Sequence, residues 1–293
     1  MSEKNAIIGT IIGDVVGSIY ESKNRNTPSV FDEWFPKVRE CRFTDDSVLT
    51  IAVADAIMQT EKKKDDKHFE RFFKESLIDN FHYHSRQRSC SFEYRFLDWL
   101  IRRETRPYNS KDNGSAMRVS PIAYTSKTME DVLDMAKLSA QVTHNNHKAI
   151  KGAQAVAAAI FFARTGHGKE EIRRFIEERF YKLSFTLDEI RPIYKYDISC
   201  NNSIPQAIVA FLEASDFEEA INNAISLGGG TLASIAGSIA GAYYPIPEYL
   251  RDKVLTYLTS EQTDIVLQFE KQYVCHFPFC RRELLSETLY WNA

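Results

Sequence analysis

The sequence predicts an all-α protein, and three observations lead to this fold class. Almost every long segment has apolar residues at helical spacing, whereas the alternation of apolar and polar residues that is typical of strands is nearly absent. Two segments repeat small residues every four positions. Hydrophobic residues make up 44% of the 293 residues, which is enough for a sizeable core. No internal repeat or low-complexity linker divides the chain, so we expect a compact single domain of many packed helices over residues 1–293.

The two segments with small residues predict a pair of buried helices, Ala6 to Tyr20 and Ser234 to Tyr244. Glycine inside a helix costs about 1 kcal/mol relative to alanine, so glycines repeated on one face indicate that two backbones approach closely. The same use of small residues occurs in membrane helices, but these runs are too short and too polar to span a bilayer. The small residues are Gly9, Gly13 and Gly17 in the first segment and Ala233, Gly237 and Gly241 at the second.

The other predicted helices follow one another with short connections. The charged run from Lys62 to Lys67 is typical of a solvated connection between helices rather than of a binding patch. In chain order, the helical segments are Val48 to Ile57, Lys67 to Phe81, Phe92 to Arg103, Met129 to Val142, Ala149 to Arg164, Lys169 to Phe180, Pro205 to Ala214, Phe217 to Ile225, Pro247 to Leu258 and Glu261 to Tyr273.

Composition and charge disfavour several functional classes. With 37 basic and 40 acidic residues spread along the chain, the formal charge is −3, which argues against a nucleic-acid-binding surface. The apolar run from Ala6 to Ile12 is interrupted by Asp14 and is followed by no cleavage site, so we expect neither a signal peptide nor a membrane span. Nothing in the sequence indicates an oligomeric state.

The five cysteines are an odd number, are widely spaced and form no Cys-x-x-Cys pair. This usage is typical of reduced thiols, so we expect a cytoplasmic protein. Cys275, His276 and Cys280 resemble a partial soft-metal cluster, but no second pair of ligands accompanies them, so we do not expect a metal there.

Two adjacent carboxylates, Asp45 and Asp46, follow Thr44 directly before an apolar helical segment. Such acids at a helix start can cap the helix. Capping explains one carboxylate better than two, because neighbouring negative charges repel each other. Mg²⁺ takes carboxylate and hydroxyl oxygens as ligands, and a helix N-terminus favours the ionised form. The residues themselves leave capping and metal binding as alternatives.

Three loops carry further polar clusters. Asn113-Gly114-Ser115 can present backbone N–H groups to a phosphate, although it is also an ordinary turn. His144 and His147 have a spacing that allows metal ligation, but such histidines are more often surface or loop-cap residues. The three glycines of Ser226 to Thr231 indicate either a tight turn or a backbone close to a ligand.

Together these motifs resemble the ADP-ribosylglycohydrolase family, and the resemblance covers nearly the whole chain in the correct motif order. The matching stretches are Ile7 to Glu21, Phe43-Thr44-Asp45-Asp46-Ser47, Asn113-Gly114-Ser115-Ala116-Met117-Arg118, Thr143-His144 with Gly152-Ala153, Tyr194 to Cys200 and Ile225 to Gly229. The resemblance implies packed helices around a central cleft for metal and ADP-ribose. It also implies a metal-dependent hydrolase that removes ADP-ribose from modified side chains or from related adducts. The ligand is then ADP-ribose, or an ADP-ribosylated protein or small molecule.

The resemblance also implies roles for individual residues. Two Mg²⁺ or Mn²⁺ ions are expected in this family, held by the early Thr-Asp-Asp and by a late Gly-Gly-Asp-x-Asp-Thr. The metal ligands that the resemblance implies in this sequence are Thr44, Asp45, Asp46 and Thr231. The residues implied to line the diphosphate are Asn113, Gly114, Ser115, Ala116 and Met117, and His144 is implied to contact ADP-ribose. The implied catalytic residues are Glu21, Asp45 and Asp46.

The late metal motif departs from the family pattern. Gly228-Gly229 is followed directly by Gly230-Thr231, so the segment is shorter and lacks both carboxylates. Affinity for hard cations follows the number of charged oxygens, so we expect fewer than two ions. Asp112 adds negative charge beside the expected diphosphate.

Three alternatives therefore stay open for the function. The first is an active hydrolase with one ion, the second is a catalytically impaired homologue that binds ADP-ribose or a partner protein without turnover, and the third is a deletion variant of an active parent. The linkage is also open among arginine, serine, O-acetyl-ADP-ribose and nucleobase adducts.

Overall fold

A computed structural model describes residues 5–20, 43–86, 92–195 and 197–274, and these residues fold into packed helices with no β-strand among them. The predicted all-α class is confirmed. The elements are α1 (Ala6–Gly17), α2 (Asp45–Thr60), η2 (Glu61–Lys63), α3 (Phe69–Arg86), α4 (Tyr94–Ile101), η3 (Asn113–Ser115), η4 (Ser120–Tyr124), α5 (Met129–Gln141), α6 (His147–Arg164), α7 (Lys169–Arg179), α8 (Leu187–Ile190), α9 (Cys200–Glu213), α10 (Phe217–Ile225), α11 (Gly230–Tyr243), α12 (Glu248–Leu255), α13 (Ser260–Phe269) and η5 (Glu270–Val274).

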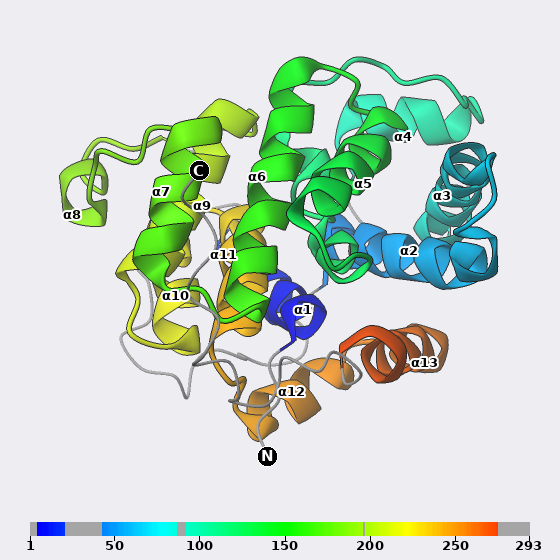
Figure 1. Cartoon of the computed structure of the whole chain (residues 1–293). Helices are drawn as coiled ribbons and strands as arrows, with labels where there is room; N and C mark the ends of the chain where they lie inside the picture. Colours follow the sequence, from blue (N-terminus) through cyan, green and yellow to red (C-terminus); the bar gives the residue numbers. More distant parts are fainter. Residues whose placement is uncertain (1–4, 21–42, 87–91, 196, 275–293) are drawn as a thin grey trace, which may run out of the picture.

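The centre of the molecule is the pair α1 and α11, which lie against each other in the middle of the helices (Figure 1). All residues of α1 are buried. A Cβ atom added to Gly9 would lie 2.1 Å from the carbonyl oxygen of Gly237, and one added to Gly13 would lie 2.1 Å from that of Ala233. The close packing predicted from the small residues is therefore confirmed, and it requires glycine because the two backbones touch.

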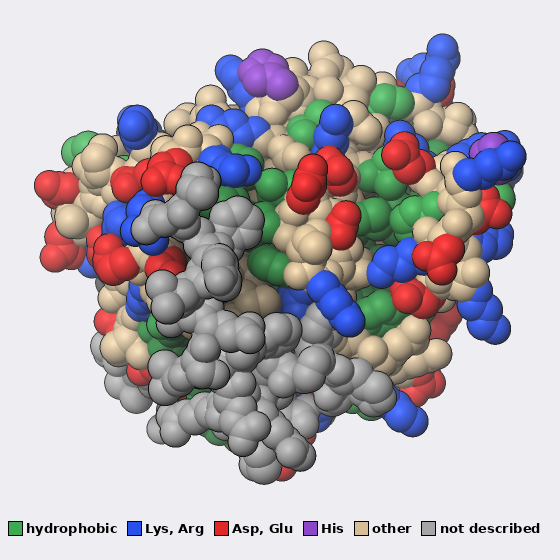
Figure 2. Space-filling view, viewed as in Figure 1, with side chains coloured by type: hydrophobic (Ala, Val, Ile, Leu, Met, Phe, Trp, Pro, Cys, Tyr) green, Lys and Arg blue, Asp and Glu red, His purple; other side chains and the backbone are tan. Residues whose placement is uncertain are grey.

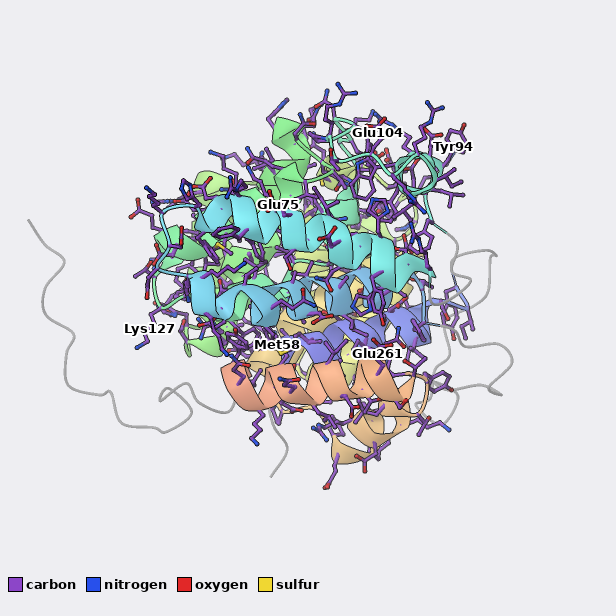
Figure 3. All side chains as sticks on the ribbon, turned by 90° about the vertical axis from the view of Figure 1, so that its right-hand side faces the viewer. Met58, Glu75, Tyr94, Glu104, Lys127 and Glu261 are labelled. Carbon is purple, nitrogen blue, oxygen red and sulfur yellow. The ribbon has the colours of Figure 1, made fainter. Side chains whose placement is uncertain are left out.

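The other helices surround this pair. On one side α6, α9 and α10 contact α11, and on the other α2 contacts α1 and is covered by α3 (Figure 1). Seen from that side, α3, α2 and α13 form successive rows across the molecule (Figure 3). The starts of α2 and α11 thereby meet near one end of the central pair, although they are far apart in the sequence.

Several helix boundaries differ from the predictions. The first helix ends at Gly17 rather than at Tyr20. Helix α9 begins at Cys200 and contains Pro205, which the sequence placed at its start, and α11 begins at Gly230 rather than at Ser234. In α9 and α11 the predicted start was shifted by a residue that usually interrupts helices, Pro205 in α9 and Gly230 in α11. The surrounding helices nevertheless bury the extra turn, because tertiary packing outweighs weak local propensities.

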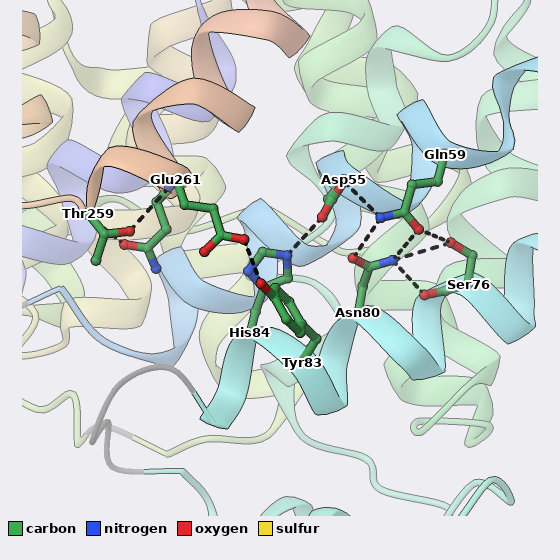
Figure 4. A network of polar contacts seen from close by, with 9 residues as sticks. Asp55, Gln59, Ser76, Asn80, Tyr83, His84, Thr259 and Glu261 are labelled. Carbon is green, nitrogen blue, oxygen red and sulfur yellow. Dashed lines mark hydrogen bonds and ion pairs between the residues drawn. The ribbon is translucent and has the colours of Figure 1, made fainter.

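A polar network joins α2, α3 and α13 (Figure 4). His84 Nε2 lies 3.0 Å from Asp55 Oδ2, and Asn80 Nδ2 donates to Gln59 Oε1 at 3.0 Å. The hydroxyl of Tyr83 donates to Glu261 Oε1 at 2.8 Å. Each of these contacts joins two different helices, so the network fixes how α2, α3 and α13 pack at the periphery.

The face seen in Figure 2 carries Lys, Arg, Asp and Glu side chains interspersed with one another. None of the helices that the structure describes has the length and apolar character needed to cross a membrane.

Candidate active site

A cavity of about 110 Å³ lies where the starts of α2 and α11 meet the loop before η3. Segments far apart in the sequence contribute to its wall, so it exists only in the folded chain. It is lined by Asp45, Leu49, Glu93, Phe96, Tyr108, Asp112, Asn113, Gly114, Met117, Arg118, His144, Ile198 and Thr231.

One wall is the N-terminus of α2, which a buried carboxylate on α1 holds in place. Asp14 accepts hydrogen bonds from the backbone N–H of Thr44 at 2.8 Å and from its hydroxyl at 2.6 Å. The backbone N–H of Ser47 also donates to Asp14 at 3.1 Å, as does the Ser47 hydroxyl. Burial nevertheless raises the pKa of Asp14, because these hydrogen bonds only partly offset the loss of water. Asp14 therefore fixes the turn that carries the two aspartates.

The structure brings the early aspartates together with Thr231. Asp46 is buried, and its Oδ2 accepts from Thr231 Oγ1 at 3.2 Å. The same oxygen lies 3.3 Å from Thr44 Oγ1, whose single hydrogen is donated to Asp14 at the shorter distance. Asp45 faces the cavity. The Thr44 hydroxyl caps α2 by accepting from Asp46 N at 3.4 Å, as the capping interpretation expects. The metal interpretation stays a prediction.

The electrostatics of Asp45 are those of a carboxylate in an acidic surrounding. Burial, followed by the negative charge of Asp14, raises the pKa of Asp45 to about 7. The positive charge of Arg118 opposes this shift but does not cancel it. An additional positive charge beside Asp45 would favour its ionised form.

The late segment supplies only hydroxyl and backbone groups to this region. Gly228 takes a left-handed conformation with φ of 92°, and α11 begins two residues later with no acidic residue in its first turn. Over the described ranges, no group of three or more His, Cys, Asp or Glu side chains is arranged to hold a metal ion. Glu21 and the Cys275, His276 and Cys280 cluster lie outside the described residues.

The opposite wall is the loop expected to line a diphosphate. The backbone N–H of Asn113 donates to the carbonyl of Ile198 at 2.8 Å, and its side chain donates to Ser203 Oγ at 3.2 Å. These bonds tie the loop to the start of α9. Of the five predicted loop residues, Asn113, Gly114 and Met117 line the cavity. Ser115 and Ala116 are buried beneath it, and the Ser115 hydroxyl donates to the Ala149 carbonyl at 3.2 Å.

His144, to which the resemblance assigns contact with ADP-ribose, lines the cavity. Burial, together with the positive charges of Arg118 and Arg95, places the pKa of His144 well below 6.5, so the imidazole is neutral near pH 7. Its ring packs edge-on against Tyr108, with 5.4 Å between the ring centroids. A Cβ atom at Gly114 would lie 3.0 Å from His144 Nε2, so glycine allows the ring edge to approach the loop backbone.

Arg118 is the main cavity residue without a role in the sequence prediction. Its side chain is fully buried, and the guanidinium lies over the Phe81 ring with 4.4 Å from Cζ to the ring centroid. Nη2 donates to Thr143 Oγ1, whereas Nε and Nη1 have no hydrogen-bond partner in the described part of the chain. Burial lowers the pKa of Arg118 to about 10, which leaves it charged at neutral pH.

Other cavity residues were also missed by the sequence reasoning. The Tyr108 hydroxyl is buried without a hydrogen-bond partner among the described residues, and burial raises the Tyr108 pKa. Arg118 could have been predicted from its position at the end of the Asn113–Arg118 motif, and Tyr108 from its place on the same loop. No feature of the sequence predicted Glu93 and Phe96, at the start of α4, as cavity residues. Only tertiary packing brings them next to the other residues of the cavity.

Comparisons with known proteins agree with this architecture. The family model described as ADP-ribosylglycohydrolase matches residues 4–274. Human ADP-ribosylhydrolase ARH3 is 27% identical over an alignment that covers 90% of this chain and 91% of the human protein. An uncharacterized protein of Archaeoglobus fulgidus is 29% identical, with 85% of this chain and 90% of that protein covered. A solved structure described as an ADP-ribosylglycohydrolase-related protein complex has the same fold, with a TM-score of 0.68, 20% identity, and coverage of 91% of this chain and 96% of that chain.

Proposed function

Because this chain belongs to the ADP-ribosylglycohydrolase family, we propose that it is a hydrolase that releases ADP-ribose from a modified side chain or a related adduct, with fewer metal ions than its family usually holds. The observation that carries the proposal is the convergence of Asp45, Thr231, Gly114 and His144 on one cavity. Carboxylate and hydroxyl oxygens lie on one wall, and a glycine-containing loop with a neutral imidazole lies on the other.

The donor set of the first wall suits a single hard divalent cation such as Mg²⁺ or Mn²⁺. Two carboxylates and two threonine hydroxyls are the oxygen ligands that such ions prefer. A bound cation would also favour the ionised form of Asp45, whose pKa burial and the charge of Asp14 raise to about 7. With no acidic residue in the first turn of α11, the same wall has too few charged oxygens for two ions. Thr44, Asp45, Asp46 and Thr231 are the residues that would hold the ion.

The chemistry follows from these groups. Cleavage at the anomeric carbon of ribose develops positive charge on the sugar, as in other glycosidic hydrolysis. Asp45, which faces the cavity, can stabilise this charge or accept a proton from the attacking water. A bound divalent cation would orient ribose hydroxyls and lower the pKa of a water molecule. Arg118 places a buried positive charge at the cavity, which favours an anionic ligand such as a diphosphate.

The second candidate function is binding of ADP-ribose, or of an ADP-ribosylated partner, without turnover. The structure of the late segment favours this alternative, because Gly229 and Gly230 lead into α11 without the carboxylates of the family pattern. The ligand-facing wall with Asn113, Gly114 and His144 does not depend on those carboxylates.

The test combines metal titration with product release. Mg²⁺ or Mn²⁺ is titrated calorimetrically into the protein, and ADP-ribose release is then measured from arginine- and serine-modified peptides and from O-acetyl-ADP-ribose. Binding of one ion together with release supports the hydrolase, and Asp45→Asn should abolish both. Asp98→Asn, which alters an exposed carboxylate on α4, is the matched control and should leave both unchanged.

Binding of ADP-ribose with no ion bound and no release from any of these substrates would replace the hydrolase by the second candidate. Failure to bind ADP-ribose at all would contradict both.

A further inference from the structure

Arg118, Thr143 and His144 form a chain of hydrogen bonds that ends at the cavity. Arg118 Nη2 lies 2.7 Å from Thr143 Oγ1, and Thr143 Oγ1 lies 2.7 Å from His144 Nδ1. All three side chains are buried. Both distances lie within the normal range of hydrogen bonds, and the positions of the hydrogens follow from which groups can donate and which can accept.

The direction of the first bond is fixed. A guanidinium has only donors, so Thr143 Oγ1 must accept from Arg118. The single hydroxyl hydrogen of Thr143 then needs its own acceptor, and His144 Nδ1 is the one in reach in the described structure. If Nδ1 carried a proton instead, the Thr143 hydrogen would be buried without a partner, which costs about 1–3 kcal/mol. A neutral imidazole has one protonated nitrogen, so its proton resides on Nε2.

His144 Nε2 has no hydrogen-bond partner among the described residues, and His144 lines the cavity. The nitrogen lies at the edge of the Gly114 backbone, which is part of the loop on the same wall. A ligand that enters the cavity is therefore the natural partner of this N–H.

We infer that the Arg118–Thr143 chain fixes His144 as the neutral Nε2–H tautomer, so that His144 donates a hydrogen bond to an acceptor oxygen of the ligand, with Thr143 as the positioning residue. That this ligand is ADP-ribose rests on the proposed function. The tautomer itself does not, because it follows from contacts within the protein.

Two consequences follow for the site. His144 cannot serve as a general base through Nε2, since that nitrogen already holds a proton. It also discriminates between ligands, because a phosphate or carbonyl oxygen can accept its hydrogen, whereas an ammonium group cannot. Beside the buried charge of Arg118, a neutral donor at this point favours an anionic ligand oxygen.

The tautomer is measured directly by ¹⁵N-labelling the histidines and recording long-range ¹H–¹⁵N correlations of the ligand-free protein. The resonances of His144 are assigned by their loss in His144→Gln. We expect the Nδ1 resonance at the downfield position of an unprotonated nitrogen and the Nε2 resonance at the upfield position of a protonated one. A protonated Nδ1 in the wild-type protein would overturn the inference, whether or not any variant folds.

The positioning role is tested with Thr143→Val, which keeps the shape and removes the hydroxyl, and with Thr143→Ser, which restores it. The valine variant should show averaged His144 ¹⁵N resonances and about tenfold weaker ADP-ribose binding in calorimetry, the effect of one hydrogen bond. The serine variant should retain the wild-type resonances and affinity. Unchanged resonances and affinity in the valine variant contradict the role of Thr143.

If wild-type protein shows the expected tautomer but does not bind ADP-ribose, the proposed function fails and the tautomer stands.

Discussion

Asp14 holds the wall of the cavity that is formed by the start of α2, because it accepts hydrogen bonds from two backbone and two side-chain donors of Thr44 and Ser47. A buried donor that loses its acceptor retains the full cost of desolvation. Its carboxylate lies on α1, whereas its partners begin α2, so it also fixes how these helices meet. The functional turn therefore depends on a residue outside the motif that it carries.

We predict that Asp14→Ala lowers the free energy of unfolding by about 3 kcal/mol, because several buried donors lose their acceptor. Urea denaturation followed by circular dichroism measures this change. Asp98→Ala is the control, since its partly exposed pair with Arg102 should contribute no more than about 0.5 kcal/mol. Equal free energies of unfolding for the two variants would show that the hydrogen bonds of Asp14 do not stabilise the contact between α1 and α2.

The neutral state of His144 predicts a pH dependence of stability. The folded protein holds its pKa well below 6.5, whereas the unfolded chain takes up a proton as the pH falls through that value. The unfolded state then binds more protons, so this histidine makes stability fall with decreasing pH, by up to about 1.4 kcal/mol per pH unit.

The measurement is the free energy of unfolding of the wild-type protein and of His144→Gln, from about pH 7 to about pH 5. The difference between the two proteins isolates His144 from the other titrating groups. We expect the wild-type protein to lose about 2 kcal/mol relative to the variant over this range. Parallel curves would mean that His144 titrates normally in the folded state.

At the scale of the elements, the pair α1 and α11 determines the geometry of the site. Its contact is made by backbone against backbone, and Gly17 at the end of α1 lies against Gly230 at the start of α11. Because Thr231 follows Gly230, the same contact places Thr231 beside Asp46. The packing of α1 against α11 thus determines where Thr231 lies in the site.

We predict that Gly13→Ala destabilises the protein by about 3 kcal/mol or more, because the added Cβ would lie 2.1 Å from the carbonyl oxygen of Ala233 and the helices must separate. Gly168→Ala adds the same atom at the start of α7, where the nearest atom is 3.8 Å away, and should cost no more than about 1 kcal/mol. Thermal unfolding of both variants gives the comparison. A small effect at Gly13 would contradict the close approach of the two helices.

At the scale of the whole molecule, the two walls of the cavity differ in how far they keep the motifs of the family pattern. The wall at the starts of α2 and α11 lacks the carboxylates that this pattern has in the late segment. One part of the wall carries Asn113, Gly114 and His144, while the part at the starts of α2 and α11 has Asp45 but no carboxylate from the first turn of α11. We expect ligand binding and metal binding to be separable in this protein for that reason. Restoring the missing charges tests this expectation.

Replacing Gly230 by Asp-Ser-Asp restores the family pattern Gly-Gly-Asp-x-Asp-Thr before Thr231. We predict tighter Mg²⁺ binding and an increased number of bound ions in calorimetry, because hard-cation affinity follows the number of charged oxygens. Replacement by Asn-Ser-Asn has the same length without the charges and is the control. If both variants bind Mg²⁺ as the wild-type protein does, the late segment is not what limits the site.

The sequence alone predicted the helical class, most helices and the contact between the two small-residue segments. These are local or periodic signals: apolar spacing of 3.6 residues marks a buried face, and glycines four apart mark a close approach. The motif order around Asp45, Asn113 and His144 also indicated the family that the comparisons show. Boundaries were less accurate at Pro205 and Gly230, where packing extends helices through residues that usually end them.

Only the tertiary structure decided which of these residues meet and in what state. Thr231 reaches Asp46 from 185 residues away, and Arg118 becomes fully buried beside Thr143 and His144. Burial, charge and hydrogen-bond direction at a site are sums over neighbours contributed by distant segments, and a pattern within one segment does not contain them. The sequence thus determined the helices and the motifs of this protein, and the fold determined the protonation state and the charge of the cavity that they form.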